Sequence, residues 1–220
     1  MNDTNFALAR HNMVEQQIRT WNMLDQSVLA VLEQFSREKF VPEEFHQMAY
    51  MDIAIPLSHD QEMMHPKIEA HLLQALDIRS TDKILEIGTG SGCVTGLLAT
   101  MGAHVDSVDI FPDFQASAAQ KLNAAGITNF TMIEADGSVG WGEDSQYDVI
   151  AITGALPELP EQFKQALAID GRLFAIVGEG KTMQAISIHR SFGNHWEEKI
   201  LFETELPYLV NAEKPQAFIF

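Results

Sequence analysis

An acidic residue, three alternating glycines and a second acidic residue form the part of the sequence best suited to bind a ligand. An apolar run typical of a buried strand, at residues 83–87, comes just before the glycines, and a helical apolar pattern, at 91–101, overlaps and follows them. Glycines between a strand and a helix permit a tight turn and let the backbone approach a ligand closely. Such a turn can hold a cofactor at the start of the helix. The five residues are Glu86, Gly88, Gly90, Gly92 and Asp109.

This arrangement resembles the S-adenosylmethionine site of Rossmann-like methyltransferases. The resemblance implies that the glycine backbone faces the amino-acid part of the cofactor. It also implies that Glu86 anchors the amides of the glycine loop and that Asp109 accepts hydrogen bonds from both ribose hydroxyls. Two alternatives stay open. A nicotinamide site would need its third glycine where the chain has Cys93, and the glycines could form a purely structural turn.

Residues after the third and fourth strands extend the predicted cofactor site. Adenine usually lies after the third strand of such a sheet, where Asp136 could accept a hydrogen bond from its amine; the alternative for Asp136-Gly137 is an ordinary turn. Residues 153–155 lack the Asn/Asp-Pro-Pro-aromatic motif of many enzymes that methylate nucleobase amines. No metal ligands are predicted. The residues expected to bind the cofactor are Glu86, Gly88, Thr89, Gly90, Gly92, Asp109, Ile110, Asp136 and Gly137.

Composition narrows the class of protein. The 220 residues include 31 acids and 14 Lys or Arg, a net charge of −17, which argues against nucleic acid as a partner because that binding needs a cationic surface. No apolar stretch approaches the 18 residues of a membrane span, and residues 1–6 do not resemble a signal peptide. A single cysteine fits a reducing compartment. We therefore expect a cytoplasmic protein that does not enter a membrane.

The hydrophobic pattern predicts an α/β fold. Alternating strands and helices imply a mostly parallel, twisted sheet with helices on both faces, closed by an antiparallel hairpin around Gly193-Asn194. We expect a single methyltransferase domain over residues 1–220, with a helical and substrate-loop extension at about 1–78 and a Rossmann-like core at about 79–220. The predicted strands are 83–87, 104–109, 129–134, 147–153, 172–177, 184–192 and 196–206. The predicted helices are 5–19, 25–37, a helix beginning at Pro66, 91–101, 112–125 and 157–167, and residues 51–66 are expected to be irregular.

Several longer segments are similar to the protein-L-isoaspartate O-methyltransferase family. The resemblance extends over about residues 10–210 and implies methylation of the free carboxylate of isoaspartyl residues in damaged proteins. The ester then closes to a succinimide, which opens to normal aspartate. The matching segments are 13–19 (MVEQQIR), 37–42 (REKFVP), 55–61 (IPLSHDQ), 85–92 (LEIGTGSG), 134–141 (EADGSVGW), 147–155 (YDVIAITGA) and 167–173 (LAIDGRL).

The chain departs from this family in the substrate loop. The family pattern is Gly-His-Gly-Gln-Thr-Ile-Ser-x-Pro, whereas residues 58–66 read Ser-His-Asp-Gln-Glu-Met-Met-His-Pro. The family's active-site serine therefore falls on Met64 and its threonine on Glu62. A thioether donates no hydrogen bond and accepts poorly, so Met64 is not expected to act as the serine does. Cys93 replaces a tyrosine that commonly follows the glycines.

Methyl transfer is an in-line displacement on a sulfonium, and a carboxylate acceptor is already ionised at neutral pH, so it needs no general base. The protein has to align the reactants and exclude water. His59 matches the family position and is the predicted catalytic contact. His65, Lys67 and backbone amides are other candidate donors to the acceptor carboxylate.

Three functions follow from these residues. The first is an S-adenosylmethionine-dependent carboxyl methyltransferase acting on isoaspartyl proteins or peptides, with S-adenosylhomocysteine as product. The second is a paralogue that methylates a different carboxylate or a small-molecule hydroxyl, because the substrate loop is altered. The third is a non-catalytic cofactor-binding module. The N-terminal helices could cover the cofactor or form a dimer, and the pattern favours neither.

Overall fold

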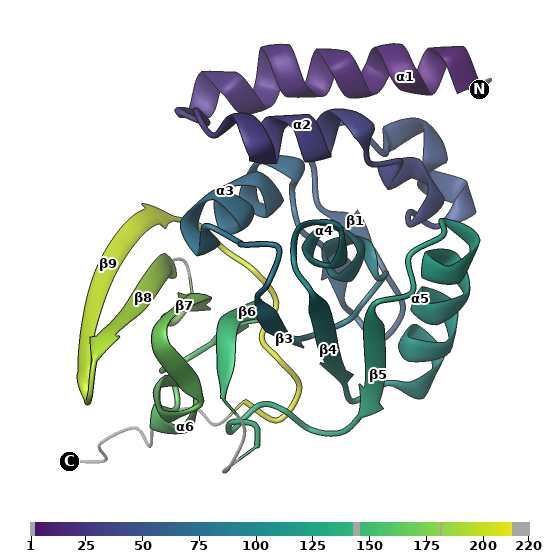
Figure 1. Cartoon of the computed structure of the whole chain (residues 1–220). Coiled ribbons are helices and arrows are strands. Elements are labelled where there is room, and N and C mark those ends of the chain that lie inside the picture. Colours follow the sequence, from purple (N-terminus) through teal and green to yellow (C-terminus); the bar gives the residue numbers. More distant parts are fainter. Residues whose placement is uncertain (1–2, 143–145, 181, 213–220) are drawn as a thin grey trace.

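A seven-stranded sheet forms the centre of the computed structural model, which describes residues 3–142, 146–180 and 182–212 (Figure 1). Its strand order is β5-β4-β3-β6-β7-β8-β9. Neighbouring strands from β5 to β7 run parallel, and β8 and β9 add antiparallel pairs, which confirms the predicted parallel sheet and closing hairpin. The strands are β3 (Lys83–Ile87), β4 (His104–Asp109), β5 (Phe130–Glu134), β6 (Tyr147–Leu156), β7 (Leu167–Val177), β8 (Gln184–Phe192) and β9 (His195–Glu203).

The helices follow the predicted order. Asp25 caps α2 by accepting hydrogen bonds from the amides of Ser27 and Val28, and Pro66 begins α3. A two-residue ladder of β1 (Ile55–Pro56) and β2 (Glu62–Met63) lies in the segment expected to be irregular. The helices are α1 (Asp3–Asn12), α2 (Gln26–Gln34), α3 (Pro66–Leu76), α4 (Cys93–Met101), α5 (Pro112–Ala124) and α6 (Glu161–Gln165), with π- and 3₁₀-helical turns at Met13–Ile18, Arg19–Trp21, Arg37–Lys39 and Glu43–Met48.

Several predicted boundaries were wrong, and the largest differences lie at α6 and β7. Helix α6 covers less than the predicted 157–167, and β7 begins five residues earlier than expected, at Leu167. Leu167 pairs with Tyr147, and the register then shifts before Arg172 pairs with Val149. Asp170 has a positive φ of 64° inside the strand. This irregularity breaks the alternation of side chains that would have identified the longer strand.

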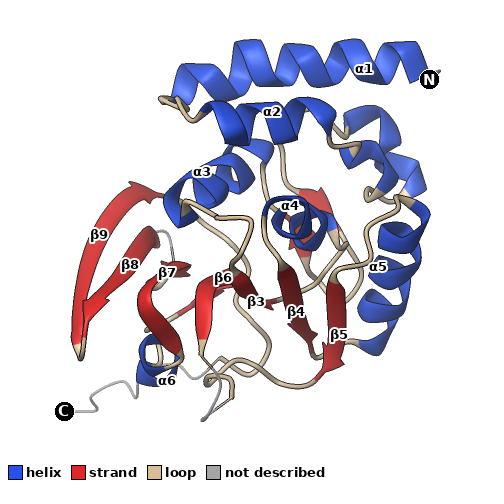
Figure 2. Cartoon of the chain, in the orientation of Figure 1, coloured by secondary structure: helices blue, strands red, loops and turns tan. Residues whose placement is uncertain are grey.

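Helices lie around the central strands of the sheet (Figure 2), and apolar side chains cover both faces of β6. In β6, Val149 and Ala151 belong to the hydrophobic cluster that includes residues of α2, α3 and α4. The alternate residues Ile150 and Ile152 belong to a second cluster with Phe163 of α6. The period of two along β6 therefore places apolar side chains on both sides of the sheet.

The N-terminal helices belong to the first of these clusters through Met13, Ile18, Val28 and Leu32. The division into an extension and a core near residue 78 stays a prediction, and the ends of its range, residues 1–2 and 213–220, lie outside the described residues. Within the described part of the chain, no helix has the length and apolar character needed to cross a membrane.

The guanidinium of Arg172 fastens the end of α3 to the sheet. The side chain is 8% exposed and forms an ion pair with the buried Asp82. Its Nε donates to the carbonyl of Leu76 at 2.8 Å, and Nη2 donates to the carbonyl of Asp77 at 2.6 Å. These carbonyls have no partner within the helix because they lie at its C-terminal end, so Arg172 fixes the helix whose other end follows the substrate loop.

We expect Arg172→Leu to lower the free energy of unfolding by about 3–5 kcal/mol, because it leaves a buried carboxylate unpaired. Urea unfolding followed by circular dichroism would measure the loss. Arg79→Leu is the matched control, since Arg79 pairs with Asp170 at the surface and exposed pairs contribute little. Equal losses in the two variants would contradict this role for Arg172.

Candidate functional site

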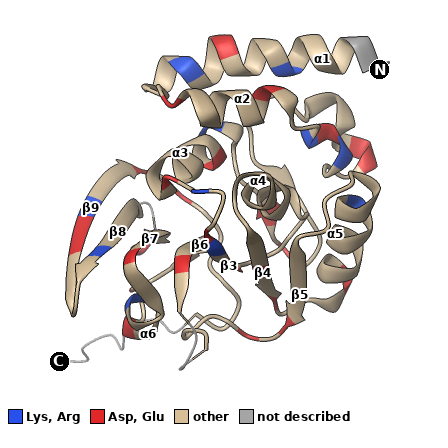
Figure 3. Cartoon of the chain, in the orientation of Figure 1, with Lys and Arg blue, Asp and Glu red and all other residues tan. Residues whose placement is uncertain are grey.

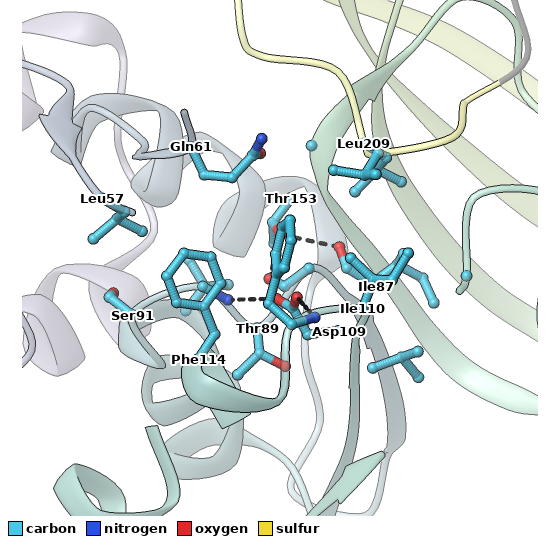
Figure 4. Close-up of a pocket in the computed structure, with 18 of the residues that line it drawn as sticks. Leu57, Gln61, Ile87, Thr89, Ser91, Asp109, Ile110, Phe114, Thr153 and Leu209 are labelled. Atoms are coloured by element: carbon cyan, nitrogen blue, oxygen red, sulfur yellow. Dashed lines mark hydrogen bonds between the residues drawn. The ribbon is translucent and has the colours of Figure 1, made fainter. Parts of the chain in front are cut away.

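The candidate site is a pocket at the carboxyl ends of the central parallel strands, where open α/β sheets bind ligands. The loops after β3, β4, β5 and β6 line it, together with residues 57 and 61–64 of the substrate loop and residues 209–210 near the C-terminal end of the described chain. In Figure 4, Leu57 and Gln61 border one side of this pocket, and Ile87 and Leu209 border the other. The substrate loop and the glycine turn thus share one cavity.

The glycine turn has the backbone conformation that its composition predicts. Gly88 lines the pocket with a φ of 99°, which side chains rarely adopt. Gly92 also has a positive φ, of 82°, but it is not among the lining residues. A Cβ at Gly92 would come within 2.7 Å of the Cβ of Ala118 in α5. The structure thus gives Gly92 a packing role, because it allows α4 and α5 to approach closely, and its contact with the cofactor stays a prediction.

Glu86 also lies outside the pocket lining, fully buried beneath the turn. Its Oε2 accepts hydrogen bonds from the hydroxyls of Thr95, at 2.5 Å, and Ser107, at 2.6 Å. The hydroxyl of Thr89 lies 2.6 Å from that of Ser107. Glu86 thus anchors the glycine loop through a chain of hydroxyls and not through the loop amides, as the sequence had suggested. Burial raises the pKa of Glu86 to about 8, against the lowering effect of the Ser107 and Thr95 hydrogen bonds.

Asp109 lies where the sequence predicts, at the end of β4 and in the pocket wall. Its Oδ2 accepts a hydrogen bond from the amide of Gly90, and its Oδ1 accepts one from the amide of Phe111, both at 2.9 Å. Burial raises the pKa of this carboxyl, and the surrounding backbone amides oppose the shift. A carboxylate has about four acceptor positions, so Asp109 can still accept from a ligand. The neighbouring Ile110 and Thr89 also line the pocket.

Beyond β5, Asp136 and Gly137 line the pocket as predicted. The carboxylate of Asp136 accepts hydrogen bonds from the amide of Ser138 at 2.9 Å and from the side chain of Asn211 at 2.8 Å. No local pattern pointed to Asn211, because it lies 75 residues from Asp136 along the chain. The hydrogen bond nevertheless joins the C-terminal segment to the loop after β5.

Sequence reasoning also missed Thr153, at the point where β6 passes the glycine turn. Its hydroxyl lies 3.0 Å from the carbonyl of Ile87 and 2.5 Å from that of Gly88. It lines the pocket and is labelled in Figure 4. The signal was present in the sequence, since the threonine is the last residue of the fourth predicted strand.

The structure does not place His59 at the pocket. Its ring stacks on Phe111 with centroids 3.9 Å apart, and Nε2 lies 3.0 Å from both carboxylate oxygens of Asp113. Phe111 lines the pocket and His59 does not, so His59 joins the substrate loop to the start of α5, and its catalytic contact stays a prediction. His65 and Lys67 likewise face Asp52 instead of the cavity.

Met64, at the position of the family serine, is buried and lines the pocket. The Asp and Glu residues in the lining are Glu62, Glu69, Asp109 and Asp136, and among the described residues no Lys, Arg or His joins them. Basic residues are instead distributed over separate elements, including α1, α5, β8 and β9 (Figure 3). Such a lining favours a cationic ligand, because carboxylates attract positive charge.

Comparison with known proteins identifies the family. The family model described as protein-L-isoaspartate(D-aspartate) O-methyltransferase matches residues 8–209. The chain belongs to this family. A relative from Methanoculleus marisnigri, named protein-L-isoaspartate O-methyltransferase, is 38% identical over 184 residues, covering 84% of each chain. Another, from Pelobacter propionicus, named protein-L-isoaspartate O-methyltransferase 2, is 33% identical and covers 93% of this chain and 91% of the relative.

The fold of the methyltransferase agrees with this assignment. A crystal structure of a Plasmodium falciparum protein, described as a protein-L-isoaspartate O-methyltransferase in complex with S-adenosyl-L-homocysteine, superimposes with a TM-score of 0.78. The two are 20% identical, and the alignment covers 91% of this chain and 97% of the other. The protein is thus an S-adenosylmethionine-dependent methyltransferase with a Rossmann-like fold.

We expect Asp109→Ala to weaken binding of S-adenosylhomocysteine by about 1–3 kcal/mol, because the variant loses charged hydrogen-bond acceptors in the pocket. Isothermal titration calorimetry would measure the change. Asp170→Asn, on the surface at the start of β7, is the control and should leave the affinity unchanged. An unaltered affinity of Asp109→Ala would remove this residue from the cofactor site.

Because Glu86 is buried, we expect the free energy of unfolding to depend on pH. Its pKa rises from an ordinary value of 4.5 to about 8 on folding, so the folded state holds a proton that the unfolded chain loses between these values. Stability should therefore fall as the pH rises from about 4.5 to 8, by at most about 5 kcal/mol at 1.36 kcal/mol per pKa unit.

In Glu86→Gln this contribution disappears, and the slope of unfolding free energy against pH should flatten. Urea unfolding at pH 5, 6, 7 and 8 would compare it with wild type and with Glu197→Gln on the exposed strand β9. Identical slopes in all three proteins would show that Glu86 is ionised in the folded state.

Proposed function

We propose that this methyltransferase methylates the free carboxylate of isoaspartyl residues in damaged proteins and peptides. The observation that carries the proposal is the family match over residues 8–209, combined with a pocket in which the substrate loop and the glycine turn line one cavity. The relatives that share this family are named for that substrate.

The pocket residues fit the cofactor. Asp109 would hold the ribose hydroxyls, the backbone of Gly88 and Gly90 would face the amino-acid part, and Asp136 would accept from the adenine amine. The acidic lining matches the sulfonium and ammonium charges. When bound, the cofactor supplies an electrophilic methyl group.

The chain's own residues have to position the acceptor and exclude water. Leu57, Met63 and Phe114 line the cavity with apolar surface, which removes water from the reacting groups and strengthens electrostatic interactions there. Because a carboxylate acceptor is ionised at neutral pH, no residue has to remove a proton from it. The role of the protein is therefore alignment.

A second candidate function is methylation of a different carboxylate or of a small-molecule hydroxyl. Met64 favours it, since the buried thioether in the pocket wall cannot donate the hydrogen bond of a serine. Glu62 in the same loop adds a carboxyl on the pocket. A neutral acceptor would meet less electrostatic repulsion from this lining than an anionic one.

We further infer a cytoplasmic enzyme whose acceptors are proteins or peptides and not nucleic acids. The support is the net charge of −17 and the single cysteine, which is a free, buried thiol.

We expect the wild-type enzyme to transfer labelled methyl from S-adenosylmethionine to an isoaspartyl peptide and not to the matching aspartyl peptide. Scintillation counting after peptide separation would measure the transfer, with S-adenosylhomocysteine binding as a check of the folded site. Transfer to neither peptide by an enzyme that binds the cofactor would contradict the isoaspartyl substrate. If the Met64→Ser variant then transferred methyl to the isoaspartyl peptide, the substitution in the substrate loop would explain why the wild type uses a different acceptor.

A further inference from the structure

A buried carboxyl at the substrate-loop side of the pocket has no role in the reaction described so far. Glu69 of α3 is 2% exposed and lines the pocket together with Met64 and Cys93. Its Oε1 lies 3.3 Å from Nη1 of Arg37, and the Cys93 thiol lies 4.0 Å from its Oε2. One carboxyl oxygen thus faces a guanidinium, whereas the other has a weak thiol donor.

Arg37 lies behind this wall and does not line the pocket. It is 3% exposed, and its Nη2 donates to the carbonyl of Met64 at 2.8 Å. Its Nε is buried without a hydrogen-bond partner among the described residues. The guanidinium therefore holds the backbone at position 64 and balances the charge of one carboxylate.

Other titratable groups near Glu69 do not add a cation that could balance a second carboxylate. Burial raises the pKa of the Cys93 thiol far above its usual range, so that Cys93 is neutral. Glu86 and Lys121 approach this cluster from β3 and α5 and have opposite effects on the pKa of Cys93. Lys121 donates to the carbonyl of Phe40 at 3.0 Å.

The basic residues of the substrate loop and of α3 also have partners other than Glu69. His65 and Lys67 pair with Asp52, and His71 lies against Phe202. Glu62 lines the same pocket, where burial raises the pKa of its carboxyl. An acceptor carboxylate would therefore enter a site that already contains acids and a single paired guanidinium.

Two carboxylates that share a buried site cannot both remain ionised without a large electrostatic cost, and a proton bound between them removes this cost. We propose that the acceptor carboxylate binds beside Glu69 with uptake of one proton, which the two carboxyls share. Glu69 then donates the O–H hydrogen bond that Met64 cannot supply. This inference rests on the proposed carboxylate acceptor.

The protonation of Glu69 is accessible near neutral pH. Burial raises its pKa to about 7, against the lowering effect of Arg37. A protonated carboxyl donates one hydrogen bond, as a serine hydroxyl does. Glu69 is in this sense a positioning residue, because it orients one acceptor oxygen and leaves the other free to react.

The test is the pH dependence of KM for an N-acetylated isoaspartyl peptide, measured from pH 6 to 9 at saturating S-adenosylmethionine. In the wild type, KM should rise about tenfold per pH unit above the Glu69 pKa while kcat changes little, because bound acceptor holds the proton. Glu69→Gln donates an amide N–H at every pH and keeps a carbonyl for Arg37, so its KM should stay constant. Glu198→Gln on the exposed strand β9 is the matched control and should follow the wild type.

A second measurement does not depend on the variant. Calorimetric titration of the wild type with the peptide and S-adenosylhomocysteine, in buffers of different ionisation enthalpy near pH 8, should show uptake of about one proton. Absence of proton uptake, or an equal pH dependence of KM in Glu69→Gln, would overturn the role of Glu69 while leaving the isoaspartyl activity intact. Failure of the wild type to methylate the peptide at any pH would remove both proposals.

Discussion

The pocket depends on one carboxylate that joins two loops. Asp109 accepts hydrogen bonds from the amide of Gly90 in the turn after β3 and from the amide of Phe111 at the start of α5. These two loops follow the adjacent parallel strands β3 and β4. By bridging them with an ion buried at the carboxyl edge of the sheet, the fold prepares the cofactor side of the pocket before any ligand binds.

The substrate loop is then attached to this preformed edge. Phe111 lines the pocket on one side and stacks on His59 on the other, and His59 also contacts Asp113. The loop is thereby held by the first residues of α5, whose position depends on Asp109. At its other end the loop continues into α3, which Arg172 fastens to the sheet. Both ends of the substrate loop are thus anchored to elements that also define the cofactor side.

The sequence predicted the features that follow from local patterns. The order of the strands, the glycine turn and the positions of Asp109 and Asp136 all arise from apolar periodicity and short-range spacing. The contacts of Glu86 and Gly92 could not be predicted because their partners, Ser107 and Ala118, lie on other elements. His59 matched a motif, but a motif does not specify which way a side chain turns. Asn211 and the Arg37–Glu69 pair needed tertiary structure, since their contacts join distant segments.

The charge of the pocket connects these results to the choice of acceptor. A lining with carboxyls and without described cations favours a sulfonium cofactor, but it repels an anionic acceptor. Because Met64 stands at the position of the family serine, this position also lacks a hydroxyl that could donate a hydrogen bond to the acceptor carboxylate. The anionic acceptor is therefore stabilised even less. A donor that takes the place of the serine hydroxyl need not lie in the substrate loop. We propose that Glu69 on α3, which is buried against Arg37, becomes such a donor when it takes up a proton. Under the proposed role of Glu69, acceptor specificity depends on the proton shared at this carboxyl as well as on the loop that contains Met64.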